Sequence, residues 1–328
     1  MRCAVISRFG KELDALRIVE RPDLTATGEN IRVRVAATAI NRADLLQRRG
    51  LYHAPRGTVQ EIPGLEFVGY VDQIGEAVMQ WKGGERVFGI VPGGSYAEQV
   101  LTHERLVVAV PDGMSDEQAA AVPEAFIASH DALVTQGRMR SGELVLIHAV
   151  AGGIGSAAVQ LVQLSGARAI GTAGSDEKLA RVATLAPFFP VNYREKGFQE
   201  AIEAEFGKEA VDLILDTVGG SHWQGNLALL GDRGRLVLMG LLGGPTAHTP
   251  LATVLTKRLN ITGTVLRSRP LEERILATQA FAREVLPHLR DGRIRPVVDS
   301  VFPFERLRDA TARMEKGENV GKIVLILA

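Results

Sequence analysis

The sequence predicts an α/β protein in which a mostly β first part is followed by a doubly wound parallel sheet. From residue 143 onward, short apolar strands alternate with helical segments, which is the signature of repeated βαβ units. The first of these strands runs into a glycine-rich turn, "AVAGGIG" at 149–155, that opens a helix. The chain has 328 residues, which is enough for two domains.

The first part of the chain, 1–110, reads as β-strands separated by turns. Strands are expected at 30–40, 67–75 and 85–91. The pattern then changes to an alanine-rich helical stretch at 114–137, which is broken at Pro123. Ser115 and Gln118 have the spacing of a capping box at its start. We expect this stretch to lead the chain from one domain to the other.

The second part repeats the order strand, helix, strand. Strands are expected at 143–150, 168–174, 189–193, 211–220, 234–240 and 260–266, and helices at 154–166, 175–186, 195–207 and 222–231. One long helix is expected at 271–292, after which the chain returns to strand, helix and strand.

The composition limits the classes of function. Lys plus Arg number 38 and Asp plus Glu number 38, so the formal net charge is zero, which does not favour binding to nucleic acid or to an anionic membrane. Cys3 is the single cysteine, so neither an intramolecular disulfide nor a zinc site of several thiolates is possible. No apolar stretch has the length of a signal peptide or a membrane span. We therefore expect a cytoplasmic protein.

The glycine-rich turn lies between a predicted strand and a predicted helix, which is the context that a dinucleotide site requires. Glycine at Gly152, Gly153 and Gly155 permits positive φ and close approach of a ligand or a helix. The backbone N–H groups at the helix start, that of Ile154 included, would then face a pyrophosphate. Tight packing of a strand against a helix also favours small residues, so packing alone is the alternative.

The glycine-rich turn and six further segments of the chain resemble one known protein family. The turn "AVAGGIG" resembles the AxxGGxG turn of the medium-chain dehydrogenases/reductases, in their zinc-free quinone oxidoreductase branch. Six further segments are similar to that branch and follow in its order: "NRADLLQRRG", "PGLEFVGYV", "GERVFGI", "PEAFIASHDAL", "LILDTVGG" and "GKIVL". The resemblance implies a Rossmann NADPH-binding domain at 126–265 and a GroES-like catalytic domain formed by 1–125 and 266–328. It also implies a homodimer formed through the Rossmann domains.

The end of the second Rossmann strand indicates which cofactor is bound. NAD enzymes usually place an acid there for the ribose hydroxyls, but this chain has none before Asp176. The resemblance assigns Gly174, Ser175, Lys178 and Tyr193 to the 2′-phosphate of NADPH, and the Lys178 ammonium suits that phosphate. The alternative is an ordinary helix cap at Ser175 with a solvated lysine.

The ligands of a catalytic zinc are missing. Zinc-dependent alcohol dehydrogenases of this superfamily have a cysteine and a histidine where this chain has Asn41 and Leu65. Glu66 is expected to satisfy neighbouring donors rather than to bind a lone metal. Without a Lewis acid an alkoxide is poorly stabilised, so alcohol oxidation is disfavoured and no metal is expected.

A quinone is a strong hydride acceptor and needs only modest support from the protein. The candidates to line the substrate cleft are Asn41, Asp44 and Tyr52, because "NRADLLQRRGLY" is similar to the family's substrate-side segment. Asn41 is expected to donate to a carbonyl, and Tyr52 to stack on or hydrogen-bond to the quinone or nicotinamide. The alternatives are that Asp44 caps a helix and that Tyr52 only shields a loop.

The nicotinamide is expected beside the ends of the last Rossmann strands. The candidate residues are Met239, Gly240, Thr264, Val265 and Leu266. Met239 would otherwise be core filler. The basic segment at 267–269 is interpreted as a solvated turn, with attraction of an anionic substrate tail as the alternative.

The predicted function is NADPH-dependent, metal-independent reduction of a small-molecule quinone. The nearest alternative is an NADPH-dependent enone or enoyl-thioester reductase, because the same zinc-free fold reduces activated C=C bonds. A different class is a non-catalytic NADPH-binding protein, structural or RNA-associated. Neutral net charge argues against the RNA-associated version.

Overall fold

In the computed structural model, which describes residues 1–327, the chain builds part of one unit, forms a second, and returns to the first. Unit 1 contains Met1–Ile127 and the chain from Leu266 onward. Unit 2 contains Ala128–Val265. Each unit has a hydrophobic core of its own, as separate domains do.

Unit 2 is built on a six-stranded sheet in the order β10-β9-β8-β11-β12-β13, in which every neighbouring pair is parallel. Its strands are β8 (Leu144–Ile147), β9 (Arg168–Ala173), β10 (Phe189–Asn192), β11 (Val211–Asp216), β12 (Leu230–Leu238) and β13 (Asn260–Gly263). The strand order reverses at β8 and β11, which is the switch point where such sheets bind ligands. The predicted doubly wound parallel sheet is confirmed.

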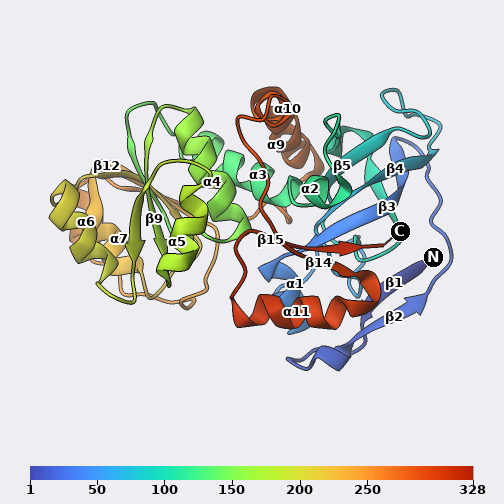
Figure 1. The fold of residues 1–328 in the computed structure, drawn as a ribbon, viewed down its shortest axis with the longest axis horizontal. Helices are drawn as coiled ribbons and strands as arrows, with labels where there is room; N and C mark the ends of the chain where they lie inside the picture. Colours follow the sequence, from blue (N-terminus) through green and yellow to red (C-terminus); the bar gives the residue numbers. More distant parts are fainter. Residues whose placement is uncertain (328) are drawn as a thin grey trace. The chain divides into compact units, whose positions relative to one another are not determined.

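Helices cover both faces of this sheet, with α4 and α5 on one side and α6 and α7 on the other (Figure 1). The helical segments are α3 (Pro123–His130), which crosses the boundary between the units, the π-helix η3 (Asp131–Gln136), α4 (Gly153–Leu164), α5 (Asp176–Ala183), α6 (Phe198–Phe206), α7 (Trp223–Leu229) and α8 (Leu251–Thr256). α5 shows why the sequence folds this way: Ser175 caps its first turn, and Leu179 and Val182 are buried one turn apart.

Unit 1 is mostly β. Its strands are β1 (Arg2–Ile6), β2 (Leu16–Glu20), β3 (Asn30–Ile40), β4 (Glu66–Ile74), β5 (Arg86–Ile90), β6 (Gln99–His103), β7 (Val107–Ala109), β14 (Val298–Pro303) and β15 (Lys322–Ile326). β1 and β2 pair by themselves, and the main sheet runs β14-β15-β3-β4-β5-β7 with β6 also on β3. β15 pairs antiparallel with the C-terminal half of β3, with Ile323 opposite Ile40. Lys322, the first residue of β15, therefore lies beside Asn41, the residue that follows β3.

The helical segments of unit 1 are η1 (Leu13–Ala15), α1 (Arg42–Arg48), η2 (Glu104–Leu106), α2 (Asp116–Ala120), α9 (Leu271–Glu284), α10 (Leu286–Arg290), η4 (Phe304–Arg306) and α11 (Leu307–Lys316). The capping box predicted at Ser115 and Gln118 is present at the start of α2. The prediction of a single helix at 271–292 is wrong. The helix is interrupted at Val285, because Pro287 lacks an N–H group and fits the first turn of α10 rather than the interior of one continuous helix.

Candidate functional site

The glycine-rich turn of unit 2 has a conformation that the sequence did not define. None of its three glycines has a positive φ; the left-handed residue is Ala149, with φ 51°. Gly155 is required by packing, because a Cβ there would lie 2.5 Å from the Ala149 carbonyl oxygen and from the Val150 Cα. At Gly152 the nearest atom to a Cβ would be 3.4 Å away. Packing therefore explains Gly155, whereas Gly152 needs another reason for being small.

The N-terminus of α4 supplies that reason. Gly152 is its N-cap, contributes no side-chain cap, and no acidic residue lies in the first turn. The N–H groups of Gly153, Ile154 and Gly155 begin the helix, so they have no partner one turn earlier within it. Ser129 Oγ donates to the Ile154 carbonyl at 2.9 Å and holds the turn. A pyrophosphate fits this terminus by its charge and by the absence of side chains.

The predicted 2′-phosphate residues follow the ends of two neighbouring strands. β9 and β10 pair in parallel and end together, Ala173 opposite Asn192. A Cβ on Gly174 would lie 2.8 Å from the Tyr193 hydroxyl and 3.1 Å from Arg194 Nε, so both groups lie directly over the glycine. We call Gly174, Tyr193 and Arg194 the phosphate corner. Its hydroxyl and guanidinium suit a phosphate, so the residues fit the adenosine end of NADPH.

Ser175 and Lys178 lie beside this corner. The Ser175 hydroxyl accepts a hydrogen bond from the Lys178 backbone N–H at 3.4 Å, so the helix cap named as the alternative is present. The cap therefore accounts for the serine hydroxyl. Sequence reasoning missed Arg194, although it directly follows Tyr193 in the segment "NYR" at 192–194.

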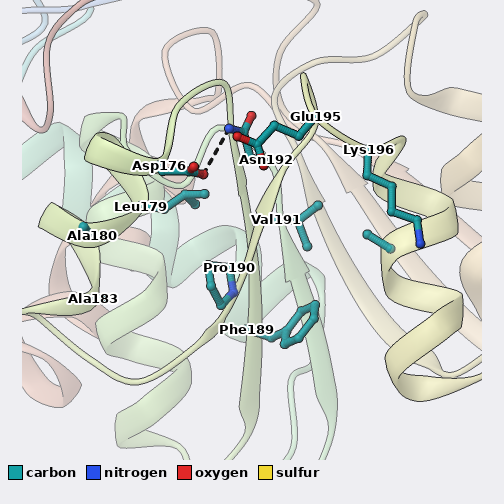
Figure 2. A pocket seen from close by; sticks show the side chains of 11 residues that line it. Asp176, Leu179, Ala180, Ala183, Phe189, Pro190, Val191, Asn192, Glu195 and Lys196 are labelled. Atoms are coloured by element: carbon teal, nitrogen blue, oxygen red, sulfur yellow. Dashed lines mark hydrogen bonds between the residues drawn. The ribbon is translucent and has the colours of Figure 1, made fainter.

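A cavity of about 420 Å³ lies between α5, β10 and α6 (Figure 2). Its walls are mainly apolar, with Leu179, Phe189 and Val191 among them. At its edge Asn192 Nδ2 donates to Asp176 Oδ1 at 3.0 Å. The first acid after β9 is thereby bound to the amide of the next strand. The apolar walls do not match a phosphate, which fits the phosphate corner better.

A buried histidine connects the strands at the switch point. His148 Nε2 lies 2.7 Å from Asn226 Oδ1, and its Nδ1 lies 2.9 Å from Thr172 Oγ1. Asn226 Nδ2 donates to Asp216 at 3.0 Å, so its oxygen must accept from His148. Nε2 therefore carries the proton and Nδ1 accepts from the threonine. Burial lowers the pKa of His148 to about 4, which keeps the imidazole neutral at pH 7. We call these four residues the histidine centre.

The residues predicted for the nicotinamide fall on both sides of the boundary between the units. Met239 and Gly240 directly follow β12, and Thr264 N donates to the Leu238 carbonyl at 2.9 Å. Met239 is only partly buried, so it is not simple core filler. Val265 is the last residue of unit 2 and is 46% exposed. Leu266 is the first residue of unit 1 after the boundary and is buried.

Unit 1 contains a buried ion pair where the sequence suggested a substrate-binding amide. Lys322 Nζ lies 2.6 Å from Glu66 Oε1 and 2.5 Å from Asn41 Oδ1. Asn41 Nδ2 donates to Glu66 Oε1 at 2.9 Å and to the Ala39 carbonyl at 3.3 Å. Both ends of the Asn41 amide are thus engaged within the protein, so donation to a substrate carbonyl would require one of these hydrogen bonds to break.

Asp44 is buried and has a structural partner for each oxygen. Oδ2 accepts from Asn41 N and from the Tyr96 hydroxyl, each at 2.8 Å, and Oδ1 accepts from Gly64 N at 3.0 Å. With Asn41 it forms the capping box of α1. Burial raises the pKa of Asp44, and these hydrogen bonds oppose the rise. The alternative of helix capping is therefore the one the structure shows.

Tyr52 is held from one side by Arg267. The guanidinium carbon lies 4.9 Å from the centre of the Tyr52 ring, and its nitrogens donate to Gln47 Oε1 and to the Pro92 carbonyl, each at 2.6 Å. Arg267 is only 8% exposed, so its interpretation as a solvated turn is wrong. Burial raises the pKa of Tyr52 to about 12, and the Glu124 charge adds to the rise. Among the described residues the Tyr52 hydroxyl has no hydrogen-bond partner, so it is free for a ligand.

Glu124 completes this group of side chains. Its backbone N–H, in the first turn of α3, donates to Glu66 Oε2 at 2.8 Å. Burial, with the nearby Glu66 charge, raises the pKa of the Glu124 carboxyl to about 8. Sequence reasoning missed Glu124 and Lys322; each is a lone charge in an apolar segment, "PEAF" and "GKIVL", which was the available signal. We call Asn41, Glu66, Glu124 and Lys322 the lysine centre.

The donor set of the lysine centre does not fit a catalytic zinc. Leu65 is buried and apolar, the Asn41 amide is fully engaged, and an ammonium already neutralises Glu66. Within residues 1–327, no group of three or more His, Cys, Asp or Glu side chains could hold a metal ion. A cation bound at Glu66 would have to displace Lys322.

The sequence of this chain matches two protein families and several known proteins. Residues 27–112 match the family described as alcohol dehydrogenase GroES-like domain, and residues 188–325 match that described as zinc-binding dehydrogenase. The chain is 30% identical to the quinone oxidoreductase of Sus scrofa, over 90% of this chain and 88% of that protein. It belongs to the quinone oxidoreductase branch of the medium-chain dehydrogenases/reductases. The synaptic vesicle membrane protein VAT-1 homolog of Homo sapiens is likewise 30% identical, over 99% of this chain and 86% of that protein.

Solved structures of this superfamily superpose on the whole chain. The quinone oxidoreductase of Thermus thermophilus, solved also in complex with NADPH, is 33% identical with a TM-score of 0.84 and full coverage of both chains. The CurK enoyl reductase is 26% identical with a TM-score of 0.84, covering 100% of this chain and 99% of that one. The chain is thus an oxidoreductase of a branch that works with nicotinamide cofactors. None of the helices in residues 1–327 combines the length and apolarity needed to cross a bilayer.

Proposed function

We propose that the protein is a metal-independent quinone reductase that uses NADPH. The observation that carries the proposal is the lysine centre: a buried ammonium, with Glu66 and Asn41 as partners, stands where a Lewis acid would have to bind. Alcohol oxidation needs such an acid, whereas a quinone accepts a hydride without one. When bound, a dihydronicotinamide supplies that hydride. Tyr52, with a free hydroxyl and a ring fixed by Arg267, is the group that orients the acceptor.

The preference for NADPH rests on the phosphate corner. Tyr193 and Arg194 lie over Gly174, and Lys178 follows one turn into α5. The ring of Tyr193 meets His222 edge-on at 5.9 Å, and His222 stacks on Phe198, which fixes the hydroxyl. No acid follows β9 before Asp176, whose carboxylate is bound by Asn192. The corner therefore offers donors to a phosphate dianion and has no carboxylate of its own for a free ribose hydroxyl.

One kinetic comparison tests both parts of this proposal. The wild type should reduce 1,4-benzoquinone with NADPH in the presence of excess chelator, at a rate unchanged by chelation. Lys178→Ala and Arg194→Ala should each raise KM for NADPH by about tenfold, since a charge-assisted hydrogen bond contributes about 1.5 kcal/mol at an exposed site. Both variants should leave kcat and NADH kinetics nearly unchanged. Equal use of NADH and NADPH by the wild type would overturn the NADPH assignment.

The likeness to the CurK enoyl reductase supports a second candidate, NADPH-dependent reduction of an enone or enoyl thioester. Parallel assays with a quinone and with a 2-enoyl thioester separate the two, because the true acceptor should show the higher kcat/KM. Tight NADPH binding without turnover of either acceptor would instead indicate the non-catalytic alternative.

We also propose a homodimer formed by unit 2, in the cytoplasm. β13 is an edge strand of the sheet, and its free edge is a natural place for pairing with a second copy. Near it, Leu251 and Leu255 of α8 are 74% and 78% exposed, and Leu242 after β12 is 56% exposed. Such a concentration of exposed leucines is typical of a covered surface. Light scattering should give twice the chain mass for the wild type and a monomer for Leu255→Glu.

A further inference from the structure

The lysine centre contains two carboxyl groups, those of Glu66 and Glu124, whose hydrogen-bond partners differ. Glu66 is fully buried and accepts from Lys322 at 2.6 Å, from Asn41 at 2.9 Å and from the Glu124 backbone at 2.8 Å. Every one of these partners donates to it, which stabilises its ionised form. The side chain of Glu124 is different: within residues 1–327 its carboxyl has no hydrogen-bond or ion-pair partner.

The surroundings of Glu124 favour a bound proton. Like charges face it from Glu66 on β4 and Asp44 on α1, and Lys322 on β15 and Arg267 before α9 oppose them. The two cations are already engaged elsewhere, Lys322 with Glu66 and Arg267 with Gln47. A second negative charge so near Glu66 is costly, and Glu124 is the carboxyl that avoids it by staying protonated. Glu124 as a residue is only partly buried, so solvent can return a proton to its carboxyl.

We propose that Glu124 is the proton donor to the reduced acceptor. The inference rests on the proposed reductase function. Hydride transfer leaves the acceptor with an extra electron pair and a negative charge, as a phenolate or an enolate. The Glu124 O–H bond then breaks, a new O–H or C–H bond forms on the acceptor, and the Glu124 carboxylate takes a proton from water. No further oxidant or reductant is needed.

The other groups nearby are poorer donors. Glu66 and Asp44 accept hydrogen bonds at both oxygens. The Tyr52 phenol, whose pKa is raised to about 12, releases its proton less readily than a carboxylic acid. Tyr52 therefore orients the acceptor, and Glu124, which shares its electrostatic surroundings with Tyr52 and Arg267, supplies the proton.

The test compares Glu124→Gln with the wild type in NADPH-dependent reduction of 1,4-benzoquinone and of 2-cyclohexenone between pH 6 and 10. For the wild type, kcat should fall about tenfold per pH unit above a midpoint near 8, the pKa of Glu124. Glu124→Gln should lower kcat at pH 7 by about 10²-fold or more, with the larger loss for the enone, and should abolish the midpoint. Its NADPH affinity should be retained, and its melting temperature at pH 7 should be no lower than that of the wild type.

A second variant separates chemistry from structure. Glu124→Ala should regain activity in proportion to added sodium formate, because a small carboxylic acid can take the vacated place. The matched control is Glu272→Gln, the same substitution in the first turn of α9 at an exposed site, which should keep the wild-type profile. An active wild type whose pH profile Glu124→Gln leaves unchanged, or a Glu124→Ala variant that formate does not restore, overturns the role of Glu124 alone. A wild type that binds NADPH but reduces neither acceptor overturns the proposed function and this inference with it.

Discussion

The lysine centre of unit 1 and the histidine centre of unit 2 are both buried polar groups at the ends of strands, but they handle charge in opposite ways. In the lysine centre a full ammonium lies 2.6 Å from a full carboxylate. In the histidine centre the imidazole is uncharged and is held by a neutral hydroxyl at 2.9 Å and a neutral amide at 2.7 Å. A buried charge requires a partner of opposite sign, whereas a neutral ring requires only hydrogen bonds.

This difference follows from what each centre is proposed to do. A reductase must manage negative charge where its acceptor is reduced, so a fixed cation and a carboxylic acid are useful in unit 1. Unit 2 must hold β8, β9 and β11 in register beneath a bound nucleotide. An imidazole that stays neutral between pH 5 and 8 does this without adding a charge of its own to the site. Four predictions test this contrast, in order of decreasing change in stability.

Removing the ammonium should have the largest effect. Lys322→Met should lower the free energy of unfolding of unit 1 by about 3–5 kcal/mol, because Glu66 is left charged and unpaired in the interior. Adding Glu66→Gln should recover part of this loss, since the double variant leaves no lone charge. Denaturant unfolding and hydrogen exchange in β15 provide the measurement. Lys196→Met, at an exposed pair with Glu200, is the control and should change little. If Lys322→Met and Lys196→Met lowered the free energy of unfolding by the same amount, the prediction would be contradicted.

The stability of unit 1 should fall as pH rises from about 4.5 to 8. The pKa of Glu124 is raised from 4.5 to about 8, so over this interval the folded state keeps a proton that the unfolded state has lost. The slope should be at most about 1.4 kcal/mol per pH unit, and Glu124→Gln should remove it. Unfolding curves of both proteins at five pH values measure it. Parallel curves for wild type and variant would show that Glu124 ionises normally.

Unit 2 should respond to pH in the opposite direction. The pKa of His148 is lowered from 6.5 to about 4, so its stabilising contribution is present above pH 6.5 and is lost as pH falls toward 4. The loss should again be at most about 1.4 kcal/mol per pH unit, and it should be absent in His148→Gln. His53→Gln, at an exposed site, should keep the acid loss of the wild type. If the His148→Gln variant still lost stability as pH falls, that loss would come from the titration of other groups.

Removing a single hydroxyl group at or beside each centre should give the smallest losses of stability, and these losses should differ between the two centres. Thr172→Val removes a neutral hydrogen bond to His148 and should cost about 1 kcal/mol. Tyr96→Phe removes the hydrogen bond to Asp44, which lies next to the lysine centre, and should cost about 1.5–3 kcal/mol if that carboxyl is ionised. Thermal unfolding at pH 7 measures both. Equal costs would mean that Asp44 is protonated in the fold.

A linear reading was enough to predict the doubly wound sheet, the mostly β first unit, the glycine-rich turn and the family. These features depend on local alternation of strand and helix and on short motifs, which a linear reading contains. It also marked the start of the phosphate corner through Gly174 and Tyr193. The absence of zinc ligands at Asn41 and Leu65 was equally readable from their side chains.

The contacts of those side chains became known from the folded chain alone. Asn41 meets Lys322 across 281 positions of sequence, because β15 returns to pair with β3. Arg267 is buried against Gln47, which lies 220 positions away, although its segment reads as a solvated turn. Local sequence sets propensity and periodicity, but the partner of a buried charge depends on which distant strands pair. The contacts of Asn41 and Arg267, and the surroundings of Glu124 on which its proposed role rests, therefore became visible only in the folded chain.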